Sequence, residues 1–234
     1  GELIRWGEAE FVAQEEMGRM TGFWWNPDDT RLAVQRTDES PVGVVTRAAI
    51  GATGTKVFDQ RYPVAGSDNA IVELFVMDPD GANRVKVDLG DNPDIYLARV
   101  DWAPDGSALY VQRQSREQTR LDMLRVDPAT GASEVWFTEE AARPDYWINL
   151  SDNYRFLDDG SLLWWSERDG YGQFYRFDGN DWQQLTSGDE PVTSLVGLNE
   201  ETGVFFYQAT TNVLTQQIYR ASLDGQADGA LLTD

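Results

Sequence analysis

Two side chains that carry much of enzyme chemistry, cysteine and histidine, are absent from this 234-residue sequence. Without cysteine the chain has no disulfide, no thiolate metal site and no cysteine nucleophile. Without histidine it has no Ser-His-Asp triad and no histidine-containing zinc site. We therefore predict that the chain contains no catalytic residue and no metal site.

Long apolar runs are missing as well, and none approaches the roughly 20 residues that span a bilayer. Residues 1–6 have none of the three parts of a signal peptide. Neither a phosphate-binding loop nor a dinucleotide fingerprint occurs, so no cofactor is predicted. The chain does not begin with Met and ends abruptly at 231–234, which leads us to expect a piece of a longer protein.

The charge is strongly one-sided, with 40 acidic against 19 basic residues and a net charge of −21. Nucleic acids and anionic membrane surfaces attract positive proteins, so both are disfavoured as partners. A cationic ligand is favoured instead. Nine Trp, nine Tyr and ten Phe argue for a folded core and against disorder.

One ten-residue pattern recurs along the chain, at 25–34, 102–111, 156–165 and, more loosely, 198–207. Each copy reads as a strand, a turn rich in Pro, Asp or Gly, and a second strand, and each is followed by two further strands. Four strands per repeat are typical of a β-propeller blade. A β-sandwich also has short strands and regular turns, but it would not repeat one pattern four times.

The predicted fold is therefore all-β: a partial β-propeller of about four four-stranded antiparallel blades, forming a single domain over 1–234. We place the blades at about 22–89, 97–138, 148–187 and 192–234. The wide spacing between the first two copies of the pattern predicts an insertion at about 37–69. Residues 3–6 are expected to form a strand without a partner.

Glu15 and Glu16 form one of seven adjacent acidic pairs in the chain, about as many as random placement gives. In a strand their side chains would point to opposite faces. Residues 12–20 favour helix, limited by Gly18 and Gly22, so we expect one or two helical turns that carry the pair. Two converging carboxylates would bind a cation such as a free α-amino group; the alternative is an ordinary solvated acidic surface.

The segment 8–27 resembles the recognition segment of the dipeptidyl peptidase IV family of serine peptidases. In that family a Glu-Glu pair precedes a Trp-Trp-Ser-Pro-like strand, and here Glu15 and Glu16 precede Trp24-Trp25-Asn26-Pro27. A second stretch, Tyr62-Pro63-x-Ala65-Gly66 followed by Asn69, resembles the family in the same order. Segments 147–150 and 166–171 are similar to bacterial members. Gly18 departs from the pattern, because many bacterial relatives have Asp there, and the gap to Trp24 differs by a residue from the animal enzymes.

The resemblance implies the middle of a propeller that, in the family, has eight blades and is joined to a C-terminal α/β-hydrolase domain. That domain is absent here, since no Gly-x-Ser-x-Gly elbow and no histidine occur, so this chain alone should be inactive. Family members release dipeptides with Pro or Ala in second position. By resemblance, Glu15 and Glu16 bind the substrate's free N-terminal amine and gate access to the catalytic serine.

The resemblance also implies a homodimeric parent and a periplasmic or secreted location. Its expected partners are peptide substrates with a free N-terminus and the hydrolase domain. Two alternatives stay open. One is a non-catalytic propeller that binds a protein partner, with Glu15 and Glu16 merely solvated. The other is the propeller of a related tripeptidyl peptidase or oligopeptidase.

Overall fold

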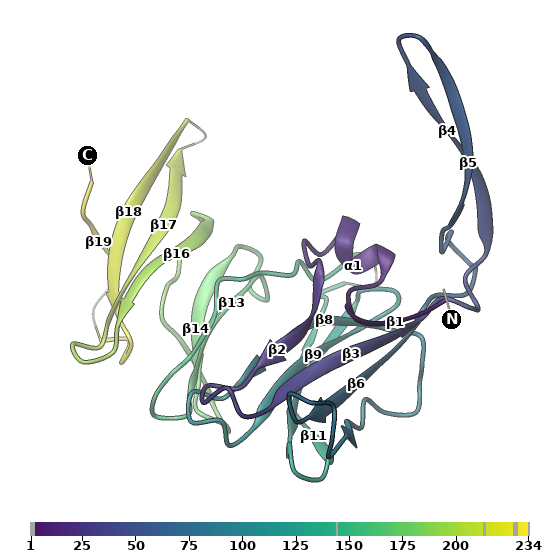
Figure 1. Ribbon diagram of the computed structural model, residues 1–234. Coiled ribbons are helices and arrows are strands. Elements are labelled where there is room, and N and C mark those ends of the chain that lie inside the picture. Colours follow the sequence, from purple (N-terminus) through teal and green to yellow (C-terminus); the bar gives the residue numbers. More distant parts are fainter. Residues whose placement is uncertain (1–2, 144, 213, 227–228, 234) are drawn as a thin grey trace. The chain divides into compact units, whose positions relative to one another are not determined.

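The computed structural model describes residues 3–143, 145–212, 214–226 and 229–233. In these ranges the regular structure is β-strand except for one short helix, α1 (Phe11–Glu15) (Figure 1). The chain divides into two compact units, Gly1–Thr138 and Glu139–Asp234. The predicted all-β class and the helical segment at the Glu-Glu pair are confirmed.

The first sheet of the Gly1–Thr138 unit has one strand more than predicted. Its spatial order is β1 (Ile4–Glu8), β2 (Thr21–Trp25), β3 (Leu32–Asp38), β6 (Ile71–Met77) and β7 (Val85–Lys86). Strands β1 and β2 share one edge of β3, where Ile4 pairs with Asp38 and Trp25 pairs with Leu32. The expectation of an unpaired strand at 3–6 is therefore wrong, because its partner is distant in sequence and leaves no mark on the local pattern.

The second sheet of this unit contains four antiparallel strands in the order of the sequence. They are β8 (Ile95–Trp102), β9 (Leu109–Ser115), β10 (Arg120–Val126) and β11 (Ser133–Glu140). Its apolar side chains pack with those of the first sheet into one core. In β6, Val72, Leu74 and Val76 are buried there and alternate with half-buried Glu73 and Phe75, as expected for a strand with one face inward.

The predicted insertion contains a hairpin that belongs to neither sheet. Strands β4 (Val44–Gly51) and β5 (Gly54–Arg61) pair only with each other and extend away from β3 and β6 (Figure 1). Most of their side chains are exposed. The hairpin is closed at its base by the Tyr62 amide, which donates to the Gly43 carbonyl at 2.9 Å.

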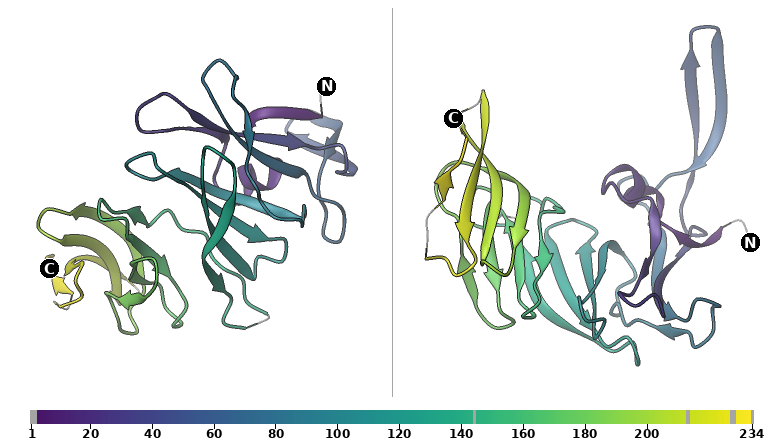
Figure 2. Two further views of the ribbon diagram at one scale, coloured as in Figure 1. Left: turned by 90° about the horizontal axis from the view of Figure 1, so that it is seen from below. Right: turned by 60° about the vertical axis from the view of Figure 1, so that its left-hand side comes forward.

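The Glu139–Asp234 unit contains two further four-stranded antiparallel sheets (Figure 2). The strands of the first are β12 (Arg155–Phe156), β13 (Leu162–Ser166), β14 (Gln173–Phe177) and β15 (Trp182–Gln184). Those of the second are β16 (Val192–Asn199), β17 (Val204–Asn212), β18 (Thr215–Ser222) and β19 (Ala230–Leu231). The sheets share a core in which the rings of Phe174 and Phe205 meet edge to face, 5.3 Å apart. The single domain and its blade boundaries stay predictions.

The repeated sequence pattern forms the same turn in three of its copies. In each, an amide donates to the carbonyl three residues earlier, from Asp29 to Asn26, from Gly106 to Ala103 and from Gly160 to Leu157, at 2.8–3.1 Å. The turn needs one residue with positive φ, which is Asp29 at 57°, Gly106 at 71° and Gly160 at 82°. Asp and Gly are residues that tolerate this conformation, so the repeat encodes a backbone geometry.

Candidate functional site

The loop that joins β1 to β2 carries the Glu-Glu pair. The two strands pair antiparallel, with Gly7 opposite Gly22 and Glu8 opposite Thr21. The ladder continues one step further, because the Ala9 amide donates to the Met20 carbonyl at 3.1 Å. A Cβ at Gly22 would lie 2.9 Å from the backbone of Glu8, so this close pairing requires glycine. Residues 9–20 therefore form a loop whose ends are fixed together by the sheet.

Helix α1 occupies the first half of this loop and lies next to β8 (Figure 1). Glu10 is its N-cap: both carboxylate oxygens lie 3.0 Å from the Ala13 amide. Ala13 and Met17 are buried and give the segment an inward face. The helix ends at Glu15, and Glu16 is the C-cap, with its amide donating to the Val12 carbonyl at 2.8 Å. Gly18 follows with φ of +63°, the left-handed conformation that commonly terminates helices.

Glu15 and Glu16 are exposed at the C-terminal end of α1. Backbone carbonyls give this end of a helix partial negative charge, so two carboxylates here oppose the stability of the helix. Among the residues that the structure describes, no ion pair or side-chain hydrogen bond to either carboxylate is found. Residues that break a local stability rule without compensation are typical of functional sites.

Arg19 holds the second half of the loop, which leads back to β2, against strands β2 and β8. Its side chain is buried, and it donates to the carbonyls of Thr21 and Leu97, both at 2.7 Å. Its guanidinium carbon lies 5.4 Å from the ring centre of Trp24, within cation–π range. The register of β8 against β9 shifts between Leu97 and Arg99, so the Leu97 carbonyl lies at a bulge, where ladder pairing is interrupted.

Burial perturbs both charged groups beneath the Glu-Glu pair. It lowers the pKa of Arg19 to about 10, although the negative charge of Glu10 acts in the opposite direction. It also raises the pKa of Glu10, while the hydrogen bond from the Ala13 amide and the charge of Arg19 counteract part of the rise. Glu10 and Arg19 are 1% and 7% exposed, so a buried acid and a buried base interact inside this loop.

The structure also brings the two family-like sequence stretches together. Tyr62, which opens the second stretch, meets Phe11 of α1 edge to face at 5.2 Å between ring centres. Asn69, which closes the second stretch, is buried just before β6. The base of the inserted hairpin therefore packs against the helix that carries Glu15 and Glu16.

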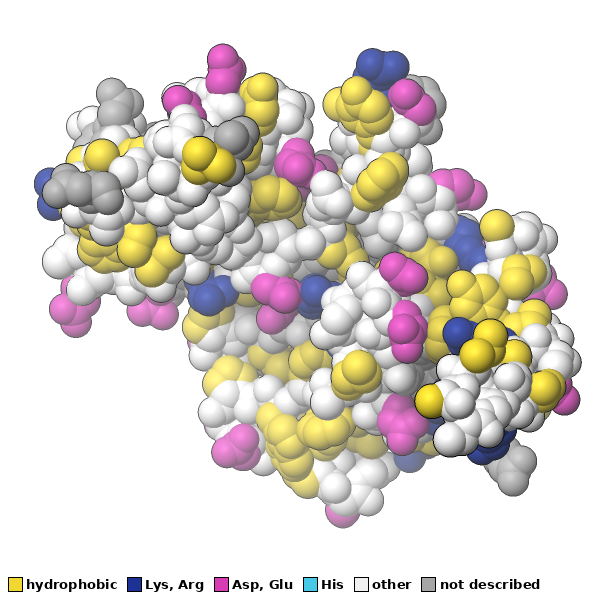
Figure 3. Space-filling view, turned by 90° about the horizontal axis from the view of Figure 1, so that it is seen from above, with side chains coloured by type: hydrophobic (Ala, Val, Ile, Leu, Met, Phe, Trp, Pro, Cys, Tyr) yellow, Lys and Arg dark blue, Asp and Glu magenta, His cyan; other side chains and the backbone are white. Residues whose placement is uncertain are grey.

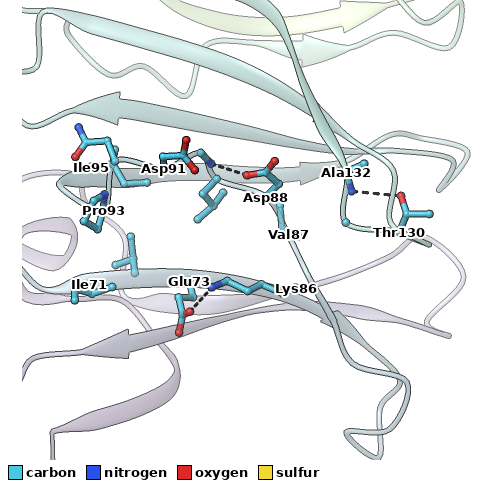
Figure 4. A pocket seen from close by; sticks show the side chains of 15 residues that line it. Ile71, Glu73, Lys86, Val87, Asp88, Asp91, Pro93, Ile95, Thr130 and Ala132 are labelled. Atoms are coloured by element: carbon cyan, nitrogen blue, oxygen red, sulfur yellow. Dashed lines mark hydrogen bonds and ion pairs between the residues drawn. The ribbon is translucent and has the colours of Figure 1, made fainter.

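A cavity of about 550 Å³ between β6, β7 and the segment that leads into β8 is a second candidate (Figure 4). Three of its four charged groups have partners. Glu73 accepts from Lys86 at 2.6 Å and from Arg36 at 2.5 Å, and Asp88 accepts from the Gly90 amide at 2.9 Å. The fourth, Asp91, is exposed to solvent and has no partner among the described residues, so the cavity offers a ligand a single free carboxylate.

The acidic side chains do not gather into one patch on the face shown in Figure 3, where they are scattered among polar and apolar ones. Among the described residues, no group of three or more acidic side chains is placed to hold a metal ion. No helix in the described part of the chain is long and apolar enough to cross a membrane.

Sequence reasoning identified Glu15 and Glu16 but missed Glu10 and Arg19. One signal was present: Arg19 is the only basic residue between Arg5 and Arg31, in a segment with several acids. A lone base among acids is a candidate for a buried partner. Its target, the Leu97 carbonyl, lies on another strand far along the chain, and no local pattern indicates that contact.

Comparison with known families gives the affiliation of the whole chain. Residues 1–234 match the family described as Dipeptidyl peptidase IV (DPP IV) N-terminal region. The chain belongs to this family. Its resemblance to dipeptidyl peptidase IV proteins, first visible in residues 8–27, is thereby confirmed.

Curated relatives of this dipeptidyl peptidase IV region include fungal proteins. A probable dipeptidyl-aminopeptidase B of Aspergillus clavatus is 29% identical over 96% of this chain, and the match covers 28% of that protein. A probable dipeptidyl peptidase 4 of Emericella nidulans is 24% identical over 90% of the chain, covering 30% of that protein. The chain thus spans less than a third of the length of these relatives.

Solved structures share its fold. The crystal structure of Porphyromonas gingivalis dipeptidyl peptidase 4 superposes with a TM-score of 0.85 at 24% identity, covering 98% of this chain and 33% of that one. A putative dipeptidyl aminopeptidase IV from Bacteroides ovatus gives a TM-score of 0.78 at 24% identity, covering 97% of this chain and 35% of that one. Together with the four-stranded sheets, this likeness supports a partial propeller.

Proposed function

We propose that this chain is the substrate-recognising propeller segment of a serine-type dipeptidyl peptidase and that Glu15 and Glu16 bind the free N-terminal amine of its peptide substrates. The complete enzyme would release Xaa-Pro and Xaa-Ala dipeptides, with catalysis in a separate hydrolase domain. The names of the curated relatives and the family match support the dipeptidyl peptidase part of the proposal.

One observation carries the amine-binding part: two adjacent carboxylates are exposed and without protein partners in the described structure, at the end of a helix held at both ends. An α-ammonium group has three donors and is largely protonated near neutral pH, with a reference pKa of about 7.7 to 8. Two carboxylates accept charge-assisted hydrogen bonds from it, each worth about 1.5 to 3 kcal/mol. An acylated amine has no charge and fewer donors, so the pair selects for a free N-terminus.

The first prediction concerns these two carboxylates in the complete enzyme. We expect Glu15→Gln and Glu16→Gln each to lower kcat/KM for a Xaa-Pro substrate at least about tenfold, or about 1.4 kcal/mol, because a neutral amide loses the charge-assisted bond. Steady-state kinetics measure the effect. The thermal unfolding midpoint should not fall, because both side chains are exposed and their charges oppose the dipole of the helix.

A matched control comes from another adjacent acidic pair, Asp189 and Glu190, which is also exposed. Asp189→Asn and Glu190→Gln each remove one negative charge, as the Glu15 and Glu16 variants do, and each should leave kcat/KM within about twofold. If both pairs behave alike, amine recognition by Glu15 and Glu16 is refuted. If the enzyme removes tripeptides or cleaves internally, the dipeptidyl assignment fails.

The complete protein is further proposed to be a homodimer that contacts its second copy through the β4–β5 hairpin. Residues that face each other across a hairpin share a face, so the register places Val44, Ala48, Ile50 and Val57 on one side. Val44, Ile50 and Val57 are 57%, 84% and 63% exposed. An isolated two-stranded hairpin is marginally stable in water, and a partner on this apolar face would stabilise it.

A further inference from the structure

We infer that Glu10 and Arg19 are positioning residues for amine recognition: this buried acid and base hold the short segment between them, so that Glu15 and Glu16 present their carboxylates in one fixed arrangement. This inference rests on the proposed function of the Glu-Glu pair. Neither residue is exposed enough to bind substrate directly, since Glu10 is 1% and Arg19 is 7% exposed.

Arg19 fixes the end of the segment that follows the pair. Its backbone amide donates to the Ala13 carbonyl at 3.0 Å, which folds the returning chain onto α1. Its guanidinium reaches the Thr21 carbonyl on β2 and the Leu97 carbonyl on β8. One side chain thus joins the loop to two strands of different sheets. Because Arg19 follows Glu16 by only three residues, a shift of this anchor moves the pair.

Glu10 fixes the other end. Its carboxylate caps the first turn of α1 at the Ala13 amide, and its carbonyl accepts from the Gln14 amide at 3.1 Å. The Gln14 side chain in turn donates to the Ala9 carbonyl at 2.6 Å. The residue just before Glu15 is therefore tied back to the start of the loop. A helix of five residues would not persist by itself, so these contacts hold it.

Charge burial supports a role beyond stability. Each of these two buried charges loses hydration, and the attraction between them only partly offsets this cost. Burial lowers the pKa of Arg19 and raises that of Glu10, so both groups are held in an environment that disfavours their charged forms. The hydrogen bonds from Arg19 to the Thr21 and Leu97 carbonyls fix the orientation of the loop, which apolar packing alone does not do.

The test is a double-mutant cycle in the complete enzyme. Arg19→Met keeps much of the apolar stem and removes both side-chain hydrogen bonds and the charge. We expect it to lower kcat/KM for a free-amine Xaa-Pro substrate about tenfold, mainly through KM, since misplacement of a binding group by about 1 Å can cost more than this. In a background that already carries Glu15→Gln and Glu16→Gln, the same substitution should cost less than about twofold.

Two further variants control for the loss of a structural arginine and for a failure of Arg19→Met to fold. Arg113 also donates to a carbonyl of another segment, Leu89 at 2.7 Å, and to Asp122, so Arg113→Met is the matched control for loss of a structural arginine. It should leave kcat/KM within about twofold in both backgrounds. If Arg19→Met does not fold, Arg19→Lys retains the charge and one donor and should give a smaller loss, again only when the pair is intact.

The outcomes separate the two claims. Equal losses from Arg19→Met in both backgrounds would overturn the positioning role while leaving amine recognition standing. A normal kcat/KM in the variant with both Glu15→Gln and Glu16→Gln would instead show that the proposed function itself is wrong. A loss from Arg19→Met that depends on the pair supports both.

Discussion

At the scale of single residues, Gly18 is where this loop departs from the family pattern expected from the sequence. Its φ of +63° lies in the left-handed region, and a Cβ built there meets no atom within 4 Å. The constraint is therefore on the backbone angle and not on space. Asp is one of the few other residues that adopt this angle, so Gly and Asp serve the same turn. We therefore expect the departure to leave the presentation of Glu15 and Glu16 intact.

The positive φ of Gly18 sets the expected order of stability of its variants. We expect Gly18→Asp to cost about 1 kcal/mol or less and Gly18→Val clearly more, because a β-branched residue is strained at positive φ. Thermal unfolding of the complete protein measures the difference. Gly43→Val is the control, since Gly43 also has open space around its Cβ but no positive φ. Equal costs at Gly18 for Asp and Val would contradict the backbone explanation.

Among elements, the β1–β2 loop and the β4–β5 hairpin meet through Phe11 and Tyr62. The hairpin is an unusual element, because its strands pair only with each other and most of its side chains are exposed. Three of its exposed apolar residues, Val44, Ile50 and Val57, share one face, whereas Phe58 lies on the other. We propose the first face as the contact with a second copy of the chain.

The hairpin prediction is a change of oligomeric state. Ile50→Glu with Val57→Glu places two charges on the apolar face, and burial of an unpaired charge at an interface is costly. We expect the complete protein to change from dimer to monomer in light scattering. Lys56→Glu lies on the opposite face and should leave the dimer intact. A dimer that survives the double substitution would exclude this face as the interface.

Two elements, the repeated turn and the helical segment, were predictable from the sequence. The repeated turn was visible because its geometry needs Asp or Gly at one position, as Asp29, Gly106 and Gly160 show. The helical segment followed from the propensity of the residues before Gly18, the glycine that follows the helix C-cap. The pairing of β1 with β3 and the reach of Arg19 to Leu97 were not predictable, because both join residues far apart in sequence. Local patterns encode local geometry, and these contacts are set by tertiary packing.

At the scale of the whole molecule, the relatives are longer proteins, and this chain matches only a part of each. It spans about a third of the solved chains that share its fold. Its sheets supply rigid strands, and its one described helix carries the acidic pair at a loop between two of them. The lack of histidine places acid–base chemistry of the triad type outside this chain. Recognition is the role that we propose for its own residues.

The measurement that tests this account most directly is the selectivity of the complete enzyme for a free amine. It compares kcat/KM for a Xaa-Pro substrate with a free N-terminus and for the same substrate N-acetylated. In the variant with both Glu15→Gln and Glu16→Gln, we predict that this ratio falls at least about tenfold, since the charge-assisted bonds are lost. A ratio equal to that of the wild type would show that Glu15 and Glu16 do not bind the substrate amine.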